Sequence, residues 1–166
     1  MITTVVVGNP KPASRTRSAS VLLAEQLTGV APDHVIDVID LGPGLLGWGD
    51  AKVAAAVETV RSSSLVVFGS PTFKATYTGL LKLFLDQFPG ATGLAGVVAV
   101  PFMLGGAAQH ALAPDLTLKP VLAELGATCA LPGLYLIDAG YADDPALSAY
   151  AERWRPVVDA LVPADE

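Results

Sequence analysis

Cysteine is almost absent from this sequence, which contains Cys129 alone among its 166 residues. A single thiol cannot form an intrachain disulfide, so the composition suits a reducing compartment and a fold held by its own core. Cys129 lies in the apolar run TCALPGLYLI, with no second thiol nearby. We therefore interpret Cys129 as a buried structural residue rather than a redox centre.

Charge and long apolar runs are also scarce. Charged residues make up 16% of the chain, and the acidic ones prevail, for a formal net charge of −6 at pH 7. A negative chain without a clustered Lys/Arg face is repelled by nucleic acid. No apolar run reaches about 18 residues without a turn signal, and the first residues carry no basic, cleavable leader pattern. We therefore expect a cytoplasmic protein without a nucleic-acid or membrane partner.

Two familiar nucleotide-binding motifs are missing as well. The segment GNPKPASRTRS, which follows the first strand-like run, contains neither the GxGxxG fingerprint of a Rossmann dinucleotide site nor the GxxxxGK[ST] phosphate loop. No nucleophile, metal-ligand cluster or carboxylate pair stands out elsewhere. His110 has no acidic or thiol partner in its loop, so we interpret it as structural, and we assign no function to His34. We expect neither a metal site nor a catalytic side chain.

Apolar residues, at 52% of the chain, are sufficient for a sizeable core, and we expect a single domain over residues 1–166. Short apolar runs alternate with longer amphipathic segments. Strands are expected at 2–8, 34–41, 65–70, 93–104 and 128–137, and helices at 14–29, 50–62, 78–88, 107–126 and from 144 towards 161. This alternation predicts an α/β doubly wound parallel sheet with helices on both faces and a ligand beyond the carboxyl ends of its strands.

The loop after the first predicted strand places polar side chains where a helix begins. They are Ser14, Arg15, Thr16 and Ser18. The unpaired amides and positive dipole of a helix start favour a phosphate, and the hydroxyls and guanidinium add hydrogen bonds suited to a phosphomonoester. The alternative is that Ser14 only caps the helix and Arg15 is solvated.

The loop after the third predicted strand begins SPTFK. Pro71 fixes its own φ and holds Ser70 extended, so this segment is expected to be rigid and open. Its backbone N–H groups can then face the polar edge of a flat heterocycle. Phe73 and Tyr77 add apolar contact, although ordinary packing explains both residues equally well.

The loop after the fourth predicted strand contains Gly105 and Gly106. This pair removes side chains where another group has to approach closely, or simply forms a turn. The three loops meet at the carboxyl edge of the predicted sheet. A phosphate cradle, a rigid aromatic-flanked segment and a glycine gap together fit a flat, phosphorylated ring system such as FMN.

Four stretches carry a resemblance that covers nearly the whole chain: SRTRSASVLL, SPTFKATYTGLLKLFLD, LGGAAQHALAPDLTLKPVLAELGA and LPGLYLID. They resemble the NAD(P)H-dependent FMN reductases of the flavodoxin-like fold, in particular the branch that serves two-component flavin monooxygenases in alkanesulfonate use. The pattern PxxKxxYxGxLKxxLD is the most specific part. The resemblance implies a sheet in the order 2-1-3-4-5 and an enzyme that passes a hydride from a reduced nicotinamide to FMN and releases FMNH2.

The resemblance also implies site residues and partners. It places Ser14, Arg15 and Thr16 at the FMN phosphate, Pro71, Thr72, Phe73 and Lys74 along the isoalloxazine and ribityl, and Gly105 with Gly106 beside the ring. We expect Lys74 to stabilise the reduced flavin anion; the alternative is a solvated surface lysine. The other implied partners are NAD(P)H, a flavin-dependent monooxygenase and further copies of the chain in a homodimer or homotetramer.

One departure from the family concerns the helix after the glycine pair. Sulfonate-linked relatives can carry an inserted aromatic residue there, at a subunit interface, whereas this chain has Leu116. Pro120 lacks the N–H that would bond to the carbonyl of Leu116, which predicts a bend.

Three alternatives stay open at this stage. The first is a flavoprotein that retains FMN and reduces quinone, azo or metal acceptors. The second is a non-enzymatic flavodoxin-type electron carrier, and the third is a non-catalytic flavin-binding or assembly protein. The sequence does not select NADH or NADPH, for which Lys11, Arg15 and Arg17 are candidate contacts.

Overall fold

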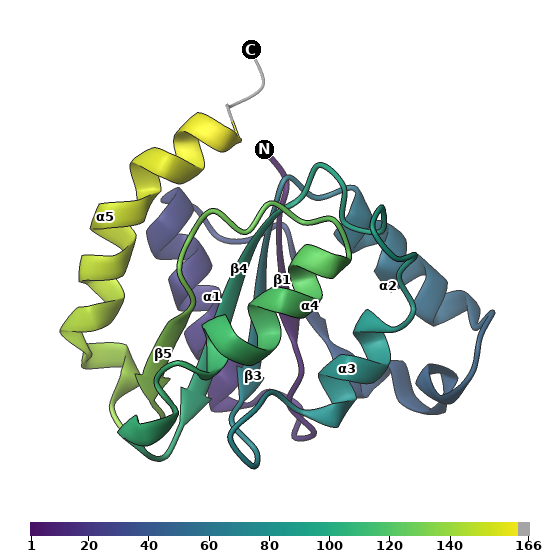
Figure 1. Cartoon of the computed structure of the whole chain (residues 1–166), viewed down its shortest axis with the longest axis horizontal. Helices are drawn as coiled ribbons and strands as arrows, with labels where there is room; N and C mark the ends of the chain where they lie inside the picture. The colour runs from purple at the N-terminus through teal and green to yellow at the C-terminus, as the bar shows by residue number, and fades with distance from the viewer. Residues whose placement is uncertain (163–166) are drawn as a thin grey trace.

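The computed structural model describes residues 1–162 and contains a five-stranded parallel sheet (Figure 1). The strand order is β2-β1-β3-β4-β5, which confirms the predicted flavodoxin-like order. The strands are β1 (Thr3–Val7), β2 (His34–Asp37), β3 (Leu65–Pro71), β4 (Val98–Gly105) and β5 (Leu134–Ile137). Because all strands run the same way, their carboxyl ends lie along one edge of the sheet.

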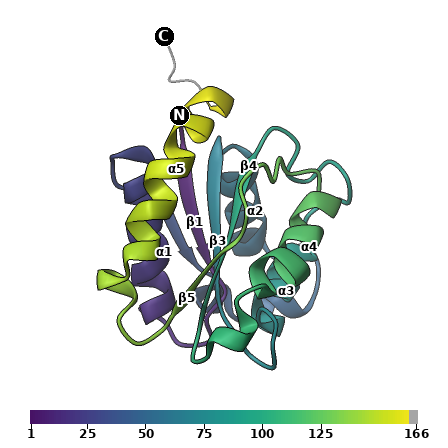
Figure 2. The same cartoon turned by 60° about the vertical axis from the view of Figure 1, so that its left-hand side comes forward.

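Helices cover both faces of the sheet, as Figure 2 shows from the side. One layer consists of α1 (Arg15–Thr28) and α5 (Pro145–Leu161). The other consists of α2 (Ala51–Arg61), α3 (Gly79–Leu85) and α4 (Lys119–Glu124). The described residues accordingly form two apolar clusters, one on each face. None of the described helices is long and apolar enough to cross a membrane.

The central strands are apolar without interruption because each of their faces is covered. Val5 and Val7 of β1 pack into the cluster below α1 and α5, whereas Val6, between them, packs into the opposite cluster. In β3 the same alternation sends Val67 to the first cluster and Phe68 to the second. All five side chains are fully buried, as expected of strands covered on both faces.

The helix boundaries follow the capping residues that the sequence contains. The Ser14 hydroxyl accepts a hydrogen bond from the Arg17 amide at 3.2 Å, and the Asp50 carboxylate caps α2. α1 ends at Gly29, whose φ of 82° is left-handed and favours glycine. Asp144 caps α5, with Pro145 at the first helical position as predicted.

Three of the predicted strands are shorter, by four residues or more, than the sequence suggested. The second ends at Asp37, and a 3₁₀ segment with a break at Gly42 occupies Val38–Leu46. β4 begins at Val98, because Gly96 turns the chain with a φ of 86°. β5 begins only at Leu134, since Pro132 interrupts the run. In these places only some of the apolar side chains are buried, such as Val38, Leu94 and Leu131, so apolar composition alone did not determine strand geometry.

The predicted helix 107–126 is divided in the structure. A 3₁₀ turn spans Ala108–His110, a π-helical turn spans Pro114–Leu118, and α4 follows directly. The Lys119 amide donates to the Pro114 carbonyl, five residues back. Because Pro120 has no N–H for the carbonyl of Leu116, a wider turn before it is a physical consequence of the sequence. At the place where Pro120 predicted a bend, the structure has a π-helical turn.

Candidate functional site

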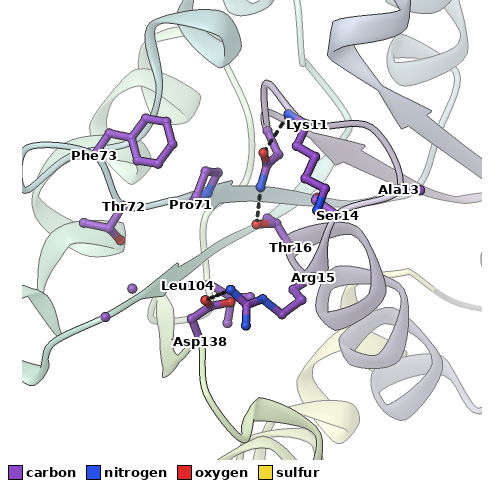
Figure 3. Close-up of a pocket in the computed structure, with 13 residues that line it drawn as sticks. Lys11, Ala13, Ser14, Arg15, Thr16, Pro71, Thr72, Phe73, Leu104 and Asp138 are labelled. Carbon is purple, nitrogen blue, oxygen red and sulfur yellow. Dashed lines mark hydrogen bonds and ion pairs between the residues drawn. The ribbon is translucent and has the colours of Figure 1, made fainter.

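A cavity of about 470 Å³ lies at the carboxyl ends of β1, β3, β4 and β5 (Figure 3). Eight of the nine residues predicted to hold FMN line it: Ser14, Arg15, Thr16, Pro71, Thr72, Phe73, Gly105 and Gly106. The ninth, Lys74, is not on the cavity wall. Five further residues complete the lining: Asn9, Lys11, Ala13, Leu104 and Asp138. Of these, the sequence suggested only Lys11, as a candidate contact for the nicotinamide cofactor.

Asn9 fastens the first loop to the start of α1. Its side-chain amide donates to the Thr16 hydroxyl at 2.9 Å, and its side-chain carbonyl accepts from the Lys11 amide at 2.9 Å. Thr16 is buried, so the loop is tied to a fixed point. The first amides of α1 have no carbonyl partner within the helix, and the helix dipole is positive there. The result is a rigid set of donors suited to an anion.

Asp37, at the end of β2, supports this loop from behind. Its carboxylate accepts from the Ala13 amide at 3.4 Å and pairs with Arg17 at 3.2 Å. The Asp37 side chain is 5% exposed, and Ala13 has a left-handed φ of 48°. Arg17 is therefore committed to Asp37 and does not line the cavity, whereas Lys11 and Arg15 do.

The segment after β3 is held at both of its ends, as its proline suggested. The Thr78 amide donates to the Ser70 hydroxyl at 3.1 Å, and the Ser70 hydroxyl donates to the Pro71 carbonyl at 2.8 Å. The Thr72 amide donates to the Leu104 carbonyl at 2.7 Å, which continues the β3–β4 pairing. The backbone at Pro71 and Thr72 is thereby fixed at the edge of the cavity.

The tip of this segment is a tight two-residue turn. Phe73 and Thr76 exchange backbone hydrogen bonds of 2.9 and 3.2 Å, and between them Lys74 and Ala75 have left-handed φ values of 53° and 66°. The Phe73 ring lines the cavity and is 50% exposed, whereas Tyr77 packs on the core below α3. Because Lys74 stands at the tip and off the wall, the role proposed for it at the flavin gains no support from the structure.

The two glycines after β4 differ in what lies beside them. A Cβ on Gly105 would lie 1.8 Å from the hydroxyl of Tyr135, which itself donates to the Ala107 carbonyl at 2.7 Å. The close approach that requires Gly105 is thus made by the protein itself. A Cβ on Gly106 would meet nothing within 4 Å. Only at Gly106 does the missing side chain leave open space beside the cavity.

Asp138 is the most informative residue that the sequence reasoning missed. Its carboxylate pairs with Arg15 at 2.7 Å across the cavity, and its amide donates to the Gly105 carbonyl at 2.9 Å. The signal available in the sequence was its position directly after β5, at the edge where ligands bind. Asn9 had a comparable signal, since an Asn side chain that bonds the backbone two residues on is a common loop device.

The chemistry of the wall suits a flat ring that carries a phosphate. The hydroxyls of Ser14 and Thr16 and the Arg15 guanidinium lie on one side, and Phe73 lies on the opposite side (Figure 3). The Thr72 hydroxyl is buried on this wall without a hydrogen-bond partner. The fit to a phosphate rests instead on the Ser14 and Thr16 hydroxyls, the Arg15 guanidinium and the first amides of α1. The residues present therefore fit FMN.

Fold and cavity together define a flavodoxin-like α/β protein with a site for a phosphorylated ring. Residues 1–142 match the family described as NADPH-dependent FMN reductase, and the chain belongs to this family. It is accordingly a flavoprotein oxidoreductase that uses FMN and a reduced nicotinamide, as the sequence resemblance predicted.

Known relatives are similar over most of the chain. The FMN reductase (NADPH) of Escherichia coli (strain K12) is 29% identical over 150 residues, which cover 83% of this chain and 74% of the relative. The NADH-dependent FMN reductase SfnF of Pseudomonas putida is 30% identical over 169 residues, covering 95% and 90%. Among solved structures, the apo form of the NADH:FMN oxidoreductase EMOB has a TM-score of 0.85 at 26% identity, covering 99% of this chain and 92% of that one.

Proposed function

We propose that the cavity at the carboxyl edge of the sheet is where this protein reduces FMN with NADH or NADPH, and that the reduced flavin then leaves for a partner monooxygenase. One observation carries the proposal: eight residues chosen from three separate loops line a single cavity. When bound, FMN accepts the hydride that the nicotinamide gives up, so the protein has to supply positioning rather than an acid or a nucleophile.

The start of α1 would hold the phosphate. The Ser14 hydroxyl accepts from the Arg17 amide and the Thr16 hydroxyl accepts from Asn9, so each keeps its own proton for a phosphate oxygen. The Arg15 guanidinium and the helix amides add donors of the right sign. This local arrangement opposes the net charge of −6, which on its own repels a phosphate.

The segment after β3 would position the ring. Its backbone is fixed at Pro71 and Thr72 by hydrogen bonds to its neighbours, and both residues line the cavity. Phe73 supplies apolar surface at the rim and is half exposed. A rim that is open to water allows a nicotinamide to enter and a flavin to leave, which favours release over permanent retention.

We further propose that residues 1–166 act as one domain in the cytoplasm and assemble into a homodimer or homotetramer. The single cysteine suits the reducing compartment in which NAD(P)H is available. Three exposed apolar side chains, Leu46, Trp48 and Leu83, line one shallow hollow beside the buried Leu45, and Leu46 and Trp48 are each 77% exposed. A cluster of this kind on the surface favours contact with another copy of the chain.

The direct test is a visible spectrum of the purified protein, followed by NADH and NADPH oxidation with and without added FMN. We expect a colourless protein whose nicotinamide oxidation depends on added FMN. A yellow protein that turns over without added FMN would instead support retained FMN and a quinone, azo or metal acceptor. No oxidation under either condition would contradict the proposed reaction.

A further inference from the structure

Asp138 is the one acidic side chain on the cavity wall among the described residues, and it is paired with a residue proposed to bind phosphate. The Arg15 Nη2 and Asp138 Oδ2 atoms are 2.7 Å apart, and the two side chains are 68% and 31% exposed. Figure 3 shows this pair joining the first turn of α1 to the end of β5. In the described part of the chain Arg15 has no other acidic partner.

A carboxylate at this place has the wrong sign for a phosphate site. A phosphomonoester carries a charge of about −1.5 to −2 near neutral pH, because its second pKa is about 6. It would be repelled by Asp138 and would compete with it for the same guanidinium N–H groups. Lys11 is the other cation on the wall, so Lys11, Arg15 and Asp138 together carry a net charge of only +1.

The second arginine–aspartate pair of α1 provides a contrast. Arg17 is bound to Asp37, whose side chain is 5% exposed and also accepts from the Ala13 amide. That pair is part of the framework and lies off the cavity wall. The Arg15–Asp138 pair lies on the wall, with Arg15 exposed and Asp138 partly exposed. Water screens such a pair, so its contribution to stability is small and a ligand can displace it.

We propose that Asp138 weakens FMN binding by competing with the flavin phosphate for Arg15. The Asp138 carboxylate pairs with Arg15 in the free protein, the phosphate displaces the carboxylate when FMN binds, and the ion pair forms again when FMN dissociates. Asp138 is thus a residue that tunes cofactor affinity through Arg15. The proposal rests on the proposed function, since it takes FMN as the ligand of this cavity. It gives a physical reason for release in a protein whose other wall residues favour the phosphate.

The test measures binding rather than turnover. Dissociation constants for FMN and for riboflavin, which lacks the phosphate, are determined by flavin fluorescence for the wild type, Asp138→Asn, Arg15→Gln and the double variant. Asp159→Asn removes the same charge from the exposed face of α5 and serves as the matched control. Thermal unfolding of each protein checks folding, and Asp138→Ser provides a second variant without the carboxylate.

We expect Asp138→Asn to bind FMN about three- to tenfold more tightly, as the removal of one exposed charge and one competing partner allows. Riboflavin affinity should stay unchanged, and the gain for FMN should shrink at high salt and largely disappear when Arg15→Gln is also present. Asp159→Asn should leave both affinities at the wild-type values.

Two results would overturn the inference while leaving the proposed function in place. If Asp138→Asn and Asp138→Ser weaken FMN and riboflavin alike, Asp138 binds the flavin directly through hydroxyl or ring groups. If the gain for FMN persists in full without Arg15, the carboxylate acts as a distant charge and not through the ion pair. A wild type that binds neither flavin would instead contradict the proposed function itself, and this inference with it.

Discussion

At the residue scale, several polar side chains of this site act by holding the backbone. Asn9 bridges its loop to Thr16, and Asp37 holds both Ala13 and Arg17 in place. Residues of this kind carry no reactive group, so a search for catalytic types passes over them. Their effect is to keep the amides at the start of α1 in a fixed arrangement, which is what a site based on positioning requires.

A first prediction concerns the strained turn between Phe73 and Thr76. Ala75 has a left-handed φ of 66°, which is unfavourable for a residue with a Cβ. We expect Ala75→Gly to raise the free energy of unfolding by about 0.5–1 kcal/mol, measured by urea denaturation. The matched control is Ala55→Gly at an exposed position inside α2, which should lower it by a similar amount. Destabilisation by both substitutions would show that the turn is not strained.

A second prediction concerns the thiol of Cys129. Burial raises the pKa of Cys129, and the nearby Lys119 opposes this only in part. A raised pKa means a smaller thiolate fraction at any given alkaline pH, so alkylation by iodoacetamide should be slower than for free cysteine. The rate should keep rising with pH beyond the range in which an ordinary thiol is fully ionised. In denaturant the rate should return to that of free cysteine; a native rate already equal to it would contradict the structural role.

At the scale of the element, α1 has two functions that the structure allows to be separated. Its apolar face packs against the sheet through Ala19, Leu23 and Leu27, while its first turn forms part of the cavity wall. Helix caps are normally a matter of stability alone. Here the Ser14 cap lies inside the proposed binding site, whereas the Asp144 cap of α5 does not.

The third prediction uses this difference between two caps. Ser14→Ala and Asp144→Ala should each lower the free energy of unfolding by about 1 kcal/mol, because each removes the acceptor for a helix amide. Only Ser14→Ala should weaken FMN binding as well, measured by fluorescence titration, since its hydroxyl is proposed to donate to the phosphate. Unchanged FMN affinity in Ser14→Ala would reduce Ser14 to a cap and nothing more.

At the scale of the whole molecule, overall charge and local charge act in opposite directions. The chain carries a net charge of −6, while the first turn of α1 and its neighbours present cations and amides to the cavity. A phosphorylated ligand is therefore attracted only at short range, where screening by salt is least effective. The remaining feature at this scale is the apolar hollow lined by Leu46, Trp48 and Leu83.

The fourth prediction tests whether that hollow joins copies of the chain. Trp48→Ser removes the largest of its exposed side chains and should shift the protein towards monomer, measured by size-exclusion chromatography with light scattering. Val30→Ser, which removes an exposed apolar side chain just after the C-cap of α1, serves as the control and should leave the mass unchanged. An equal mass for wild type and Trp48→Ser would place any interface elsewhere.

Local signals in the chain were sufficient for the class of fold and for the main part of the cavity lining. Periodicity and caps predicted the alternation of elements, and the rule that ligands bind at strand carboxyl ends directed attention to Ser14, Pro71 and Gly105. Those signals depend on residues close together in the chain, so a single sequence is sufficient to detect them. They did not distinguish the 3₁₀ segment after Asp37 from a longer strand, because apolar side chains such as Val38 and Leu41 are buried in the one as they would be in the other.

The sequence by itself determined an α/β sheet, a helix start rich in phosphate donors and a proline-stiffened loop, since each follows from neighbouring residues. Only the tertiary structure decided that Asp138 meets Arg15, that Asn9 meets Thr16, and that Tyr135 requires Gly105. These contacts bring together different loops, and their existence depends on strand register and on where each strand ends. The position of Asp138 directly after β5 can be seen in the sequence, but its pairing with Arg15 cannot, and it is this pairing that we propose sets how firmly FMN is held.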